Sequence, residues 1–273
     1  FLRGSTVHAL RLLGAEIDGN VETNGSVFAG PFDADFLRVG GGLFLRDGAR
    51  FKAVRLPRAE IRTDVSATGS TFEGLFTADG LRVDGGLILR GSTAFAEVRL
   101  LGAEIGGNFE ADRATFEGPL IADLLRVGGS LYLRDGATFA AISLLGAEIG
   151  PVAQFGASRF KGPVDMTGAR IAGEILLSGA RHGAPNWGAD SALILRNVSA
   201  DALQAEERAW TRAEDGSPLP TDLTGFAYDR LGGLNAAEGE TMADSDAAWL
   251  AGWIESQPDH DARYDPQPYE QLA

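Results

Sequence analysis

The chain of 273 residues contains no cysteine and only three histidines. The lack of cysteine excludes disulfide bonds, thiolate catalysis and zinc or iron–sulfur sites with cysteine ligands. The histidines, His8, His182 and His260, lie far apart, and none has a second candidate ligand at the spacing of a metal motif. We therefore expect no metal site and no bound cofactor.

Long apolar runs are also missing. The chain has no stretch of about 18 apolar residues that could form a membrane span, and its first residues do not follow the pattern of a signal peptide. The glycine-rich stretches "VGGG" and "VGGS" recur from repeat to repeat as turns, and no GxxxxGK[ST] loop for phosphates is present. We therefore expect no membrane span, no nucleotide cofactor and a location in the cytoplasm.

Positive charge is scarce in only one part of the chain. The formal net charge is −14, but residues 1–199 carry 22 acidic and 20 basic side chains, whereas residues 200–273 carry 16 acidic and 4 basic ones. A nearly neutral repeat region lacks the basic surface that binds nucleic acid. We therefore expect no nucleic-acid partner.

The abundant feature of the sequence is self-similarity. The stretch "LRVGGGLFLRDGARF" at 37–51 returns as "LRVDGGLILRGSTAF" at 81–95 and as "LRVGGSLYLRDGATF" at 125–139. At half this 44-residue period, one column contains only isoleucine and valine: Ile17, Val39, Ile61, Val83, Ile105, Val127, Ile149 and Ile171. Apolar and polar residues alternate between the columns, and glycines separate them, which indicates short strands joined by tight turns. A period of this length with strand signals predicts a solenoid whose 22-residue coils stack about 4.8 Å apart.

A further column of phenylalanines recurs with slips of one residue: Phe28, Phe51, Phe72, Phe95, Phe116, Phe139 and Phe160. Another column alternates small and large side chains, beginning Ala15, Leu37, Ala59, Leu81. Because a narrow interior must be filled to high density, this alternation indicates two kinds of coil that interdigitate.

A charged column accompanies the isoleucine and valine column. Its members alternate in sign over eight coils: Glu16, Arg38, Glu60, Arg82, Glu104, Arg126, Glu148 and Arg170. We call this set the ladder. We expect it on one outer face, with each carboxylate between guanidinium groups, where it would fix the register because a slip of one coil brings like charges together. A catalytic role is disfavoured because every coil carries the same residues.

The repeats, such as "GAEIDGNVETNGSVFAGPFDAD", resemble those of the pentapeptide-repeat-type right-handed β-helices of bacteria, with 22 rather than 20 residues per coil. The segments "GFAYDRLGGL", "WLAGWIESQP" and "PQPYEQLA" are similar to the C-terminal module of a bacterial group often labelled membrane-associated oxidoreductase. The resemblance implies a right-handed parallel β-helix with a C-terminal module. Neither motif identifies a reaction.

The pattern changes near residue 199. We expect a parallel β-helix repeat domain at 1–199 and a partly helical capping region at 200–273, because an open β-helix end exposes unpaired strand edges. Asp201 could begin one short helix, and Asp244 or Ser245 could cap another in "DSDAAWLAGWIESQP". The predicted fold class is an all-β solenoid, a right-handed parallel β-helix with 22-residue coils and a small, partly helical C-terminal cap.

One outward column is apolar in every second coil. In "GLFLR", "GLILR" and "SLYLR" the flanking leucines point inward, so the middle residue points outward. We call this column, with the arginines two positions later, the stripe; its members are Phe44, Ile88, Tyr132, Leu176, Arg46, Arg90 and Arg134. Glu22, Ser66, Glu110 and Gln154 interleave with the apolar members. Exposed apolar residues beside arginine often mark contact surfaces.

Three functions follow as hypotheses. The first is a non-catalytic scaffold or protein-interaction module of bacterial origin that binds another protein chain or itself. The second is an enzyme acting on polysaccharides or an oxidoreductase, with its site near residues 181–190, where His182, Trp187 and Asp190 could line a pocket. The third is a topoisomerase-binding DNA mimic, which would need an acidic stripe along the solenoid.

Overall fold

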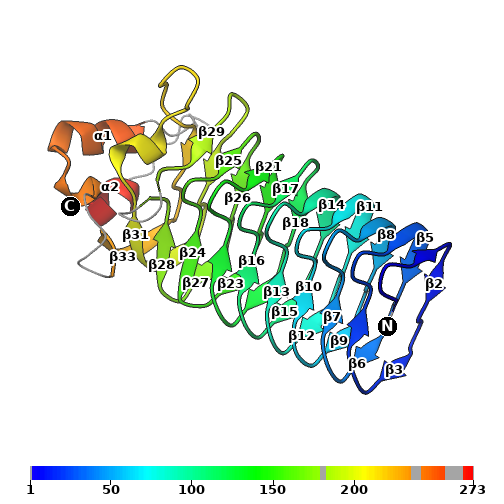
Figure 1. Ribbon diagram of the computed structural model, residues 1–273. Coiled ribbons are helices and arrows are strands. Elements are labelled where there is room, and N and C mark those ends of the chain that lie inside the picture. Colours follow the sequence, from blue (N-terminus) through cyan, green and yellow to red (C-terminus); the bar gives the residue numbers. More distant parts are fainter. Residues whose placement is uncertain (1, 179–182, 235–240, 256–266, 273) are drawn as a thin grey trace.

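Each 22-residue repeat forms one coil of a β-solenoid of about eight turns in the computed structural model (Figure 1). The structure describes residues 2–178, 183–234, 241–255 and 267–272. Strands of neighbouring coils pair in parallel, and the isoleucine and valine column stacks in register, as in Val83 opposite Ile105. The predicted parallel β-solenoid is confirmed.

One sheet of 18 strands carries both the ladder and the stripe. Its ladder strands are β3 (Glu16–Ile17), β6 (Arg38–Val39), β9 (Glu60–Ile61), β12 (Arg82–Val83), β15 (Glu104–Ile105), β19 (Arg126–Val127), β23 (Glu148–Ile149) and β27 (Arg170–Ile171). Its stripe strands are β4 (Val21–Glu22), β7 (Leu43–Phe44), β10 (Val65–Ser66), β13 (Leu87–Ile88), β16 (Phe109–Glu110), β20 (Leu131–Tyr132), β24 (Val152–Gln154) and β28 (Glu174–Leu176). The sheet ends with β31 (Ser199–Gln204) and β33 (Ala227–Leu231).

A second sheet, of 15 strands, completes each coil. Its strands in the first coils are β1 (Thr6–Val7), β2 (Leu10–Arg11), β5 (Val27–Asp33), β8 (Arg50–Arg55), β11 (Thr71–Thr77) and β14 (Ala94–Arg99). In four later coils two short strands replace the long one: β17 (Thr115–Phe116) and β18 (Leu120–Ile121), β21 (Thr138–Phe139) and β22 (Ile142–Ser143), β25 (Arg159–Phe160) and β26 (Val164–Asp165), and β29 (Asn186–Trp187) and β30 (Leu193–Ile194). The sheet ends with β32 (Thr221–Asp222).

The phenylalanine column forms a continuous stack of rings inside the solenoid. Consecutive rings from Phe28 to Phe160 lie 4.7 to 5.5 Å apart between centroids and are tilted by at most 17°. Trp187 ends the stack at 4.7 Å from Phe160, and its indole N–H donates to the Ala209 carbonyl at 2.7 Å. The stack therefore joins eight coils through one aromatic core.

The slips in the phenylalanine column arise from two kinds of coil. Val21, Phe28 and Phe32 point inward in one kind, with spacings of seven and four residues, whereas Leu43, Phe51 and Val54 have spacings of eight and three. The longer turn of the second kind places Asp47 and Gly48 in the left-handed region, with φ of 61° and 81°. The 44-residue period thus has a backbone cause in addition to side-chain packing.

The longer corner of the first kind of coil requires glycine. Gly30, Gly74, Gly118 and Gly162 recur every 44 residues at this corner. A Cβ atom at any of them would lie 2.1 to 2.5 Å from a carbonyl oxygen of the preceding coil. Only glycine therefore allows neighbouring coils to approach at this corner.

Parallel pairing continues beyond residue 199, where the composition placed the boundary. β31 pairs with β28, β32 pairs with β30, and β33 pairs with β31. The helix predicted from Asp201 is wrong, because residues 199–204 form strand β31 and only the 3-10 helix η1 (Glu207–Trp210) follows. The open edge of β28 offers backbone hydrogen bonds that outweigh the local helix preference of this segment.

Helical elements cover the C-terminal end of the solenoid (Figure 1). They are η2 (Met242–Asp244), α1 (Ala247–Glu255) and α2 (Gln267–Leu272). The Trp253 and Trp210 rings lie 5.0 Å apart, and the Gln267 side-chain amide donates to the Phe226 carbonyl at 2.7 Å. Asp246 caps α1 by accepting from the Trp249 N–H at 2.7 Å, so the caps predicted at Asp244 and Ser245 are wrong.

Candidate functional site

The ladder lies on the outer surface of one side of the solenoid. Strand register places each ladder residue directly opposite the next, from Glu16 beside Arg38 to Glu148 beside Arg170. In the following coil Ser199 stands opposite Arg170, so the alternation comprises eight residues. The ladder side chains bound shallow grooves of about 400 Å³, whose floor includes Ile17, Val39 and Ile61.

Five ion pairs join the ladder within the chain. Arg38 contacts Glu16 at 3.0 Å and Glu60 at 3.3 Å. Glu104 lies 3.3 Å from Arg82 and 3.6 Å from Arg126, and Arg126 lies 3.4 Å from Glu148. The hydrogen bond to Glu16 and the charge of Glu60 raise the pKa of Arg38 above its ordinary value. All these side chains remain largely accessible to water, which makes each pair weak.

Reversing one ladder charge should lower stability more than reversing an unpaired surface charge. Arg82→Glu places a third carboxylate between Glu60 and Glu104, so we expect a loss of about 1 kcal/mol or slightly more, from the lost ion pair with Glu104 and two new repulsions. Thermal unfolding at low and high salt measures it, and salt should reduce the loss. Arg196 is unsuitable as the unpaired control because it contacts Asp222 at 2.7 Å. Arg159, which has no ion pair within 4.0 Å among the described residues, is the better control, and equal effects of R82E and R159E would contradict the ladder's role.

The stripe forms a single column in the structure. Register places Phe44 between Glu22 and Ser66, Ile88 between Ser66 and Glu110, and Tyr132 between Glu110 and Gln154. Phe44, Ile88 and Tyr132 are half-buried, whereas Leu176 is only 9 % exposed. Leu176 lies opposite Gln204 of β31, at the end that the last coils cover. The accessible part of the stripe is therefore carried by three coils.

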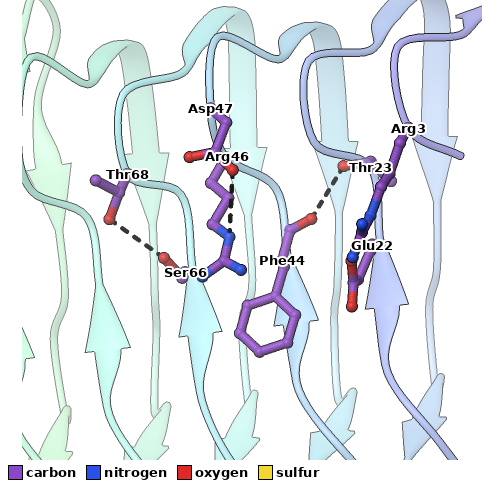
Figure 2. Close-up of polar contacts among 8 residues, drawn as sticks. All are labelled: Arg3, Glu22, Thr23, Phe44, Arg46, Asp47, Ser66 and Thr68. Atoms are coloured by element: carbon purple, nitrogen blue, oxygen red, sulfur yellow. Dashed lines mark hydrogen bonds and ion pairs between the residues drawn. The ribbon is translucent and has the colours of Figure 1, made fainter. Parts of the chain in front are cut away.

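Arginine lies over the aromatic rings of the stripe. The guanidinium carbon of Arg46 is 4.5 Å from the centroid of the Phe44 ring, and that of Arg134 is 4.0 Å from the Tyr132 ring. Figure 2 shows Phe44 between the pairs Arg46–Asp47 and Arg3–Glu22. The Phe44 ring also folds over Gly42, where a Cβ atom would lie 2.6 Å from the ring. These cation–π contacts hold both rings in fixed positions.

Acidic groups contact Arg90 and Arg134 of the stripe. Arg90 donates to Glu110 at 2.6 Å, and Arg134 lies 3.4 Å from Asp112. Burial raises the pKa of Asp112 despite the opposing charge of Arg134. Hydrogen bonding to Arg3 lowers the pKa of Glu22 at the other end of the column. The stripe is therefore an ordered, nearly neutral surface rather than a basic one.

A second set of charged residues lies on the other sheet, and the sequence analysis missed it. Arg55 contacts Asp35 at 2.9 Å, and Arg99 contacts Asp79 at 3.1 Å. The arginines and their acidic partners come from different columns of the repeat. The arginine column also contains Thr77 and Ile121, so the sequence shows no strict alternation of charge that would reveal these ion pairs. Asp222 near the C-terminal end is buried, but hydrogen bonds from Arg196 and Thr224 outweigh this burial and lower its pKa.

The segment 181–190 does not assemble the pocket considered from the sequence. Trp187 is fully buried in the aromatic stack, Asp190 is exposed, and His182 lies outside the described residues, as does His260. Within the described part of the chain, no group of three or more histidine, aspartate and glutamate side chains could hold a metal ion.

Comparisons with known proteins identify no relative of this chain. No protein-family model matches the chain, and no curated protein or solved structure shows significant similarity to it. None of the helices in the described ranges has the length and apolar character needed to cross a lipid bilayer. The functional interpretation therefore rests on the β-solenoid fold and on the two surface columns, the ladder and the stripe.

Proposed function

We propose that the protein is a non-catalytic scaffold of bacterial origin that binds another protein chain through the accessible part of the stripe. The observation that carries this proposal is the pair of arginine-covered rings, Phe44 with Arg46 and Tyr132 with Arg134. Tyrosine and arginine are common in the energetically important centres of interfaces. Because these side chains are already held in place, binding costs little side-chain entropy.

The spacing of the stripe also supports a contact surface. Phe44, Ile88 and Tyr132 lie two coils apart, which is roughly 10 Å between neighbours. Ser66 and Glu110 between them supply polar atoms. A partner chain lying along the solenoid would therefore meet alternating apolar and polar contacts. The scaffold function, the cytoplasmic location and the resemblance to pentapeptide-repeat proteins belong to the same proposal.

The other two hypotheses have less support. The fully buried Trp187 cannot line an open pocket, which removes the main residue of the proposed enzyme site. A DNA mimic needs a continuous acidic stripe, whereas the ladder alternates in sign and the stripe pairs its acids with arginines. An interaction surface is the function that the described residues favour.

The test is capture of partners from the native host by the full-length protein and by the variant F44S/Y132S. Serine suits these positions because Ser66 occupies the same column. We expect the parent to capture a defined partner, and the variant to lose at least about tenfold in affinity, as loss of two central contacts implies. T115S/T138S is the matched control on the other sheet and should bind as the parent does. A parent that captures nothing, or a variant that captures as the parent does, would contradict the proposal.

A further inference from the structure

We propose that the ladder face joins two copies of this chain in an antiparallel, two-fold symmetric dimer. This inference concerns a different column of side chains from the stripe and does not depend on the function proposed above. Its basis is the order of the eight ladder charges, which is complementary to its own reverse.

The geometry of a two-fold pair makes this complementarity explicit. If the axis runs across the coils, each column faces its own copy and the order of coils is reversed. Glu16 then faces Arg170 of the second copy, Arg38 faces Glu148, Glu60 faces Arg126, and Arg82 faces Glu104. All eight contacts across the interface have opposite charges. A parallel pair, or a shift by one coil, would bring like charges together throughout.

The column two residues after the ladder is also complementary to itself in the antiparallel arrangement, by the size of its side chains. Its N-terminal half carries the exposed side chains Asp18, Arg62 and Asp84, and its C-terminal half carries small residues, Gly106, Gly128, Gly150 and Ala172. In the full antiparallel overlap, Arg62 faces Gly128 and Asp84 faces Gly106. Three long side chains of one copy therefore meet small residues of the other, and Gly40 faces Gly150.

The turn on the other side of the ladder exposes apolar side chains that this dimer would cover. Phe36 is 54 % exposed and Leu124 is 66 % exposed, and both hold left-handed backbone conformations, with φ of 59° and 57°. Large apolar residues are rare in this conformation. In the antiparallel overlap Phe36 faces Gly146, and Leu124 faces Arg58. Burial of these side chains gives the interface an apolar component beside the ionic one.

The size of the face predicts a weak dimer. Eight coils span roughly 35 Å, and the three columns together offer roughly 500 Å² on each copy, which is at the lower limit for a specific interface. Seven of the eight ladder residues, all except Arg170, also form ion pairs with ladder neighbours in their own chain. We therefore expect a dissociation constant of about micromolar size that weakens with salt.

Sedimentation velocity over a range of protein and salt concentrations tests the proposal. The parent should dimerise at low salt and dissociate at high salt. R126E should weaken the dimer by about tenfold or more, because two opposite-charge contacts per dimer become like-charge contacts. The double variant E60R/R126E should restore dimerisation relative to R126E, because positions 60 and 126 face each other. F44S/Y132S leaves the ladder unchanged and should dimerise as the parent does.

E16R/R126E is the matched control for the rescue, since it reverses the same two kinds of charge at positions that do not face each other. It should dimerise no better than R126E. Rescue by E16R instead of E60R would overturn the full overlap in favour of a register shifted by two coils. Circular dichroism of each variant verifies that the fold is retained.

Cross-linking provides a second measurement that does not alter the ladder. The chain has no cysteine, so D84C and D18C each introduce a single thiol. In the proposed dimer the two copies of position 84 lie one coil apart, whereas the two copies of position 18 lie seven coils apart, roughly 34 Å. A short thiol-reactive cross-linker should therefore couple D84C and not D18C. A parent that stays monomeric at all concentrations, or coupling of D18C alone, would overturn the proposal.

Discussion

Replacing Phe95 with alanine should destabilise the protein by about 3–5 kcal/mol, the cost of removing a buried aromatic ring. The ring is fully buried and stacks between Phe72 at 4.7 Å and Phe116 at 5.1 Å, with Phe76 at its edge at 5.8 Å. Backbone hydrogen bonds between coils fix their spacing, so the neighbouring rings cannot close the cavity. The loss should therefore approach the upper end of this range.

Guanidinium-induced unfolding, followed by circular dichroism, measures this loss. Phe36→Ala is the matched control, because Phe36 is 54 % exposed and lies outside the stack. At protein concentrations too low for association we expect it to change stability by no more than about 0.5 kcal/mol. Similar effects of the two substitutions would show that the ring stack does not hold the coils together.

The second large effect is expected at the glycine corners. Gly118→Ala would place a Cβ atom 2.2 Å from the carbonyl oxygen of Ala96, and this oxygen belongs to the backbone of the preceding coil. A flexible side chain cannot relieve the overlap, so two coils must separate locally. We expect a loss of about 2–3 kcal/mol, which is large for the addition of one methyl group.

Gly19→Ala controls for the loss of glycine itself. Among the described residues no atom lies within 4 Å of a Cβ built at Gly19, and its φ is not in the left-handed region. Alanine restricts the unfolded chain, so this change should be neutral or stabilise the protein by up to about 1 kcal/mol. Relative to the parent, the free energy of unfolding should thus fall in Gly118→Ala and stay the same or rise in Gly19→Ala. A neutral Gly118→Ala would mean that the coils are not held at the spacing observed.

Much of the fold follows from the sequence because a solenoid repeats one local solution. Ile17 and its successors, the phenylalanine column and the ladder each keep one position in every coil, so the period alone places them. The two surface columns could be assigned for the same reason. Parallel stacking turns a spacing of 22 residues into direct contact.

The departures have physical causes that periodicity does not contain. Residues 199–204 have good helix formers, but the free edge of β28 makes them a strand. Asp246 rather than Asp244 caps α1, since the exact start of a helix depends on how its apolar face packs. The requirement for Gly118 arises from a backbone contact between coils, which one repeat considered alone does not reveal.

The chemistry of the surface was also only partly predictable. The spacing placed Arg46 near Phe44 and Arg134 near Tyr132, but it did not show that each guanidinium covers the ring. Arg196 looked isolated in the sequence because its partner, Asp222, belongs to the next coil across an irregular spacing of 26 residues. Side-chain direction, rather than column membership, decides such contacts.

The most direct test of the proposed function is the affinity of the captured partner for the purified protein, measured by calorimetry beside the free energy of unfolding. For F44S/Y132S the scaffold proposal predicts a retained fold, with a loss of about 2 kcal/mol from two half-buried rings and their cation–π contacts, together with at least about a tenfold loss of affinity. T115S/T138S should match the parent in both measurements. Full affinity in F44S/Y132S, with its fold intact, would contradict a contact surface at the stripe.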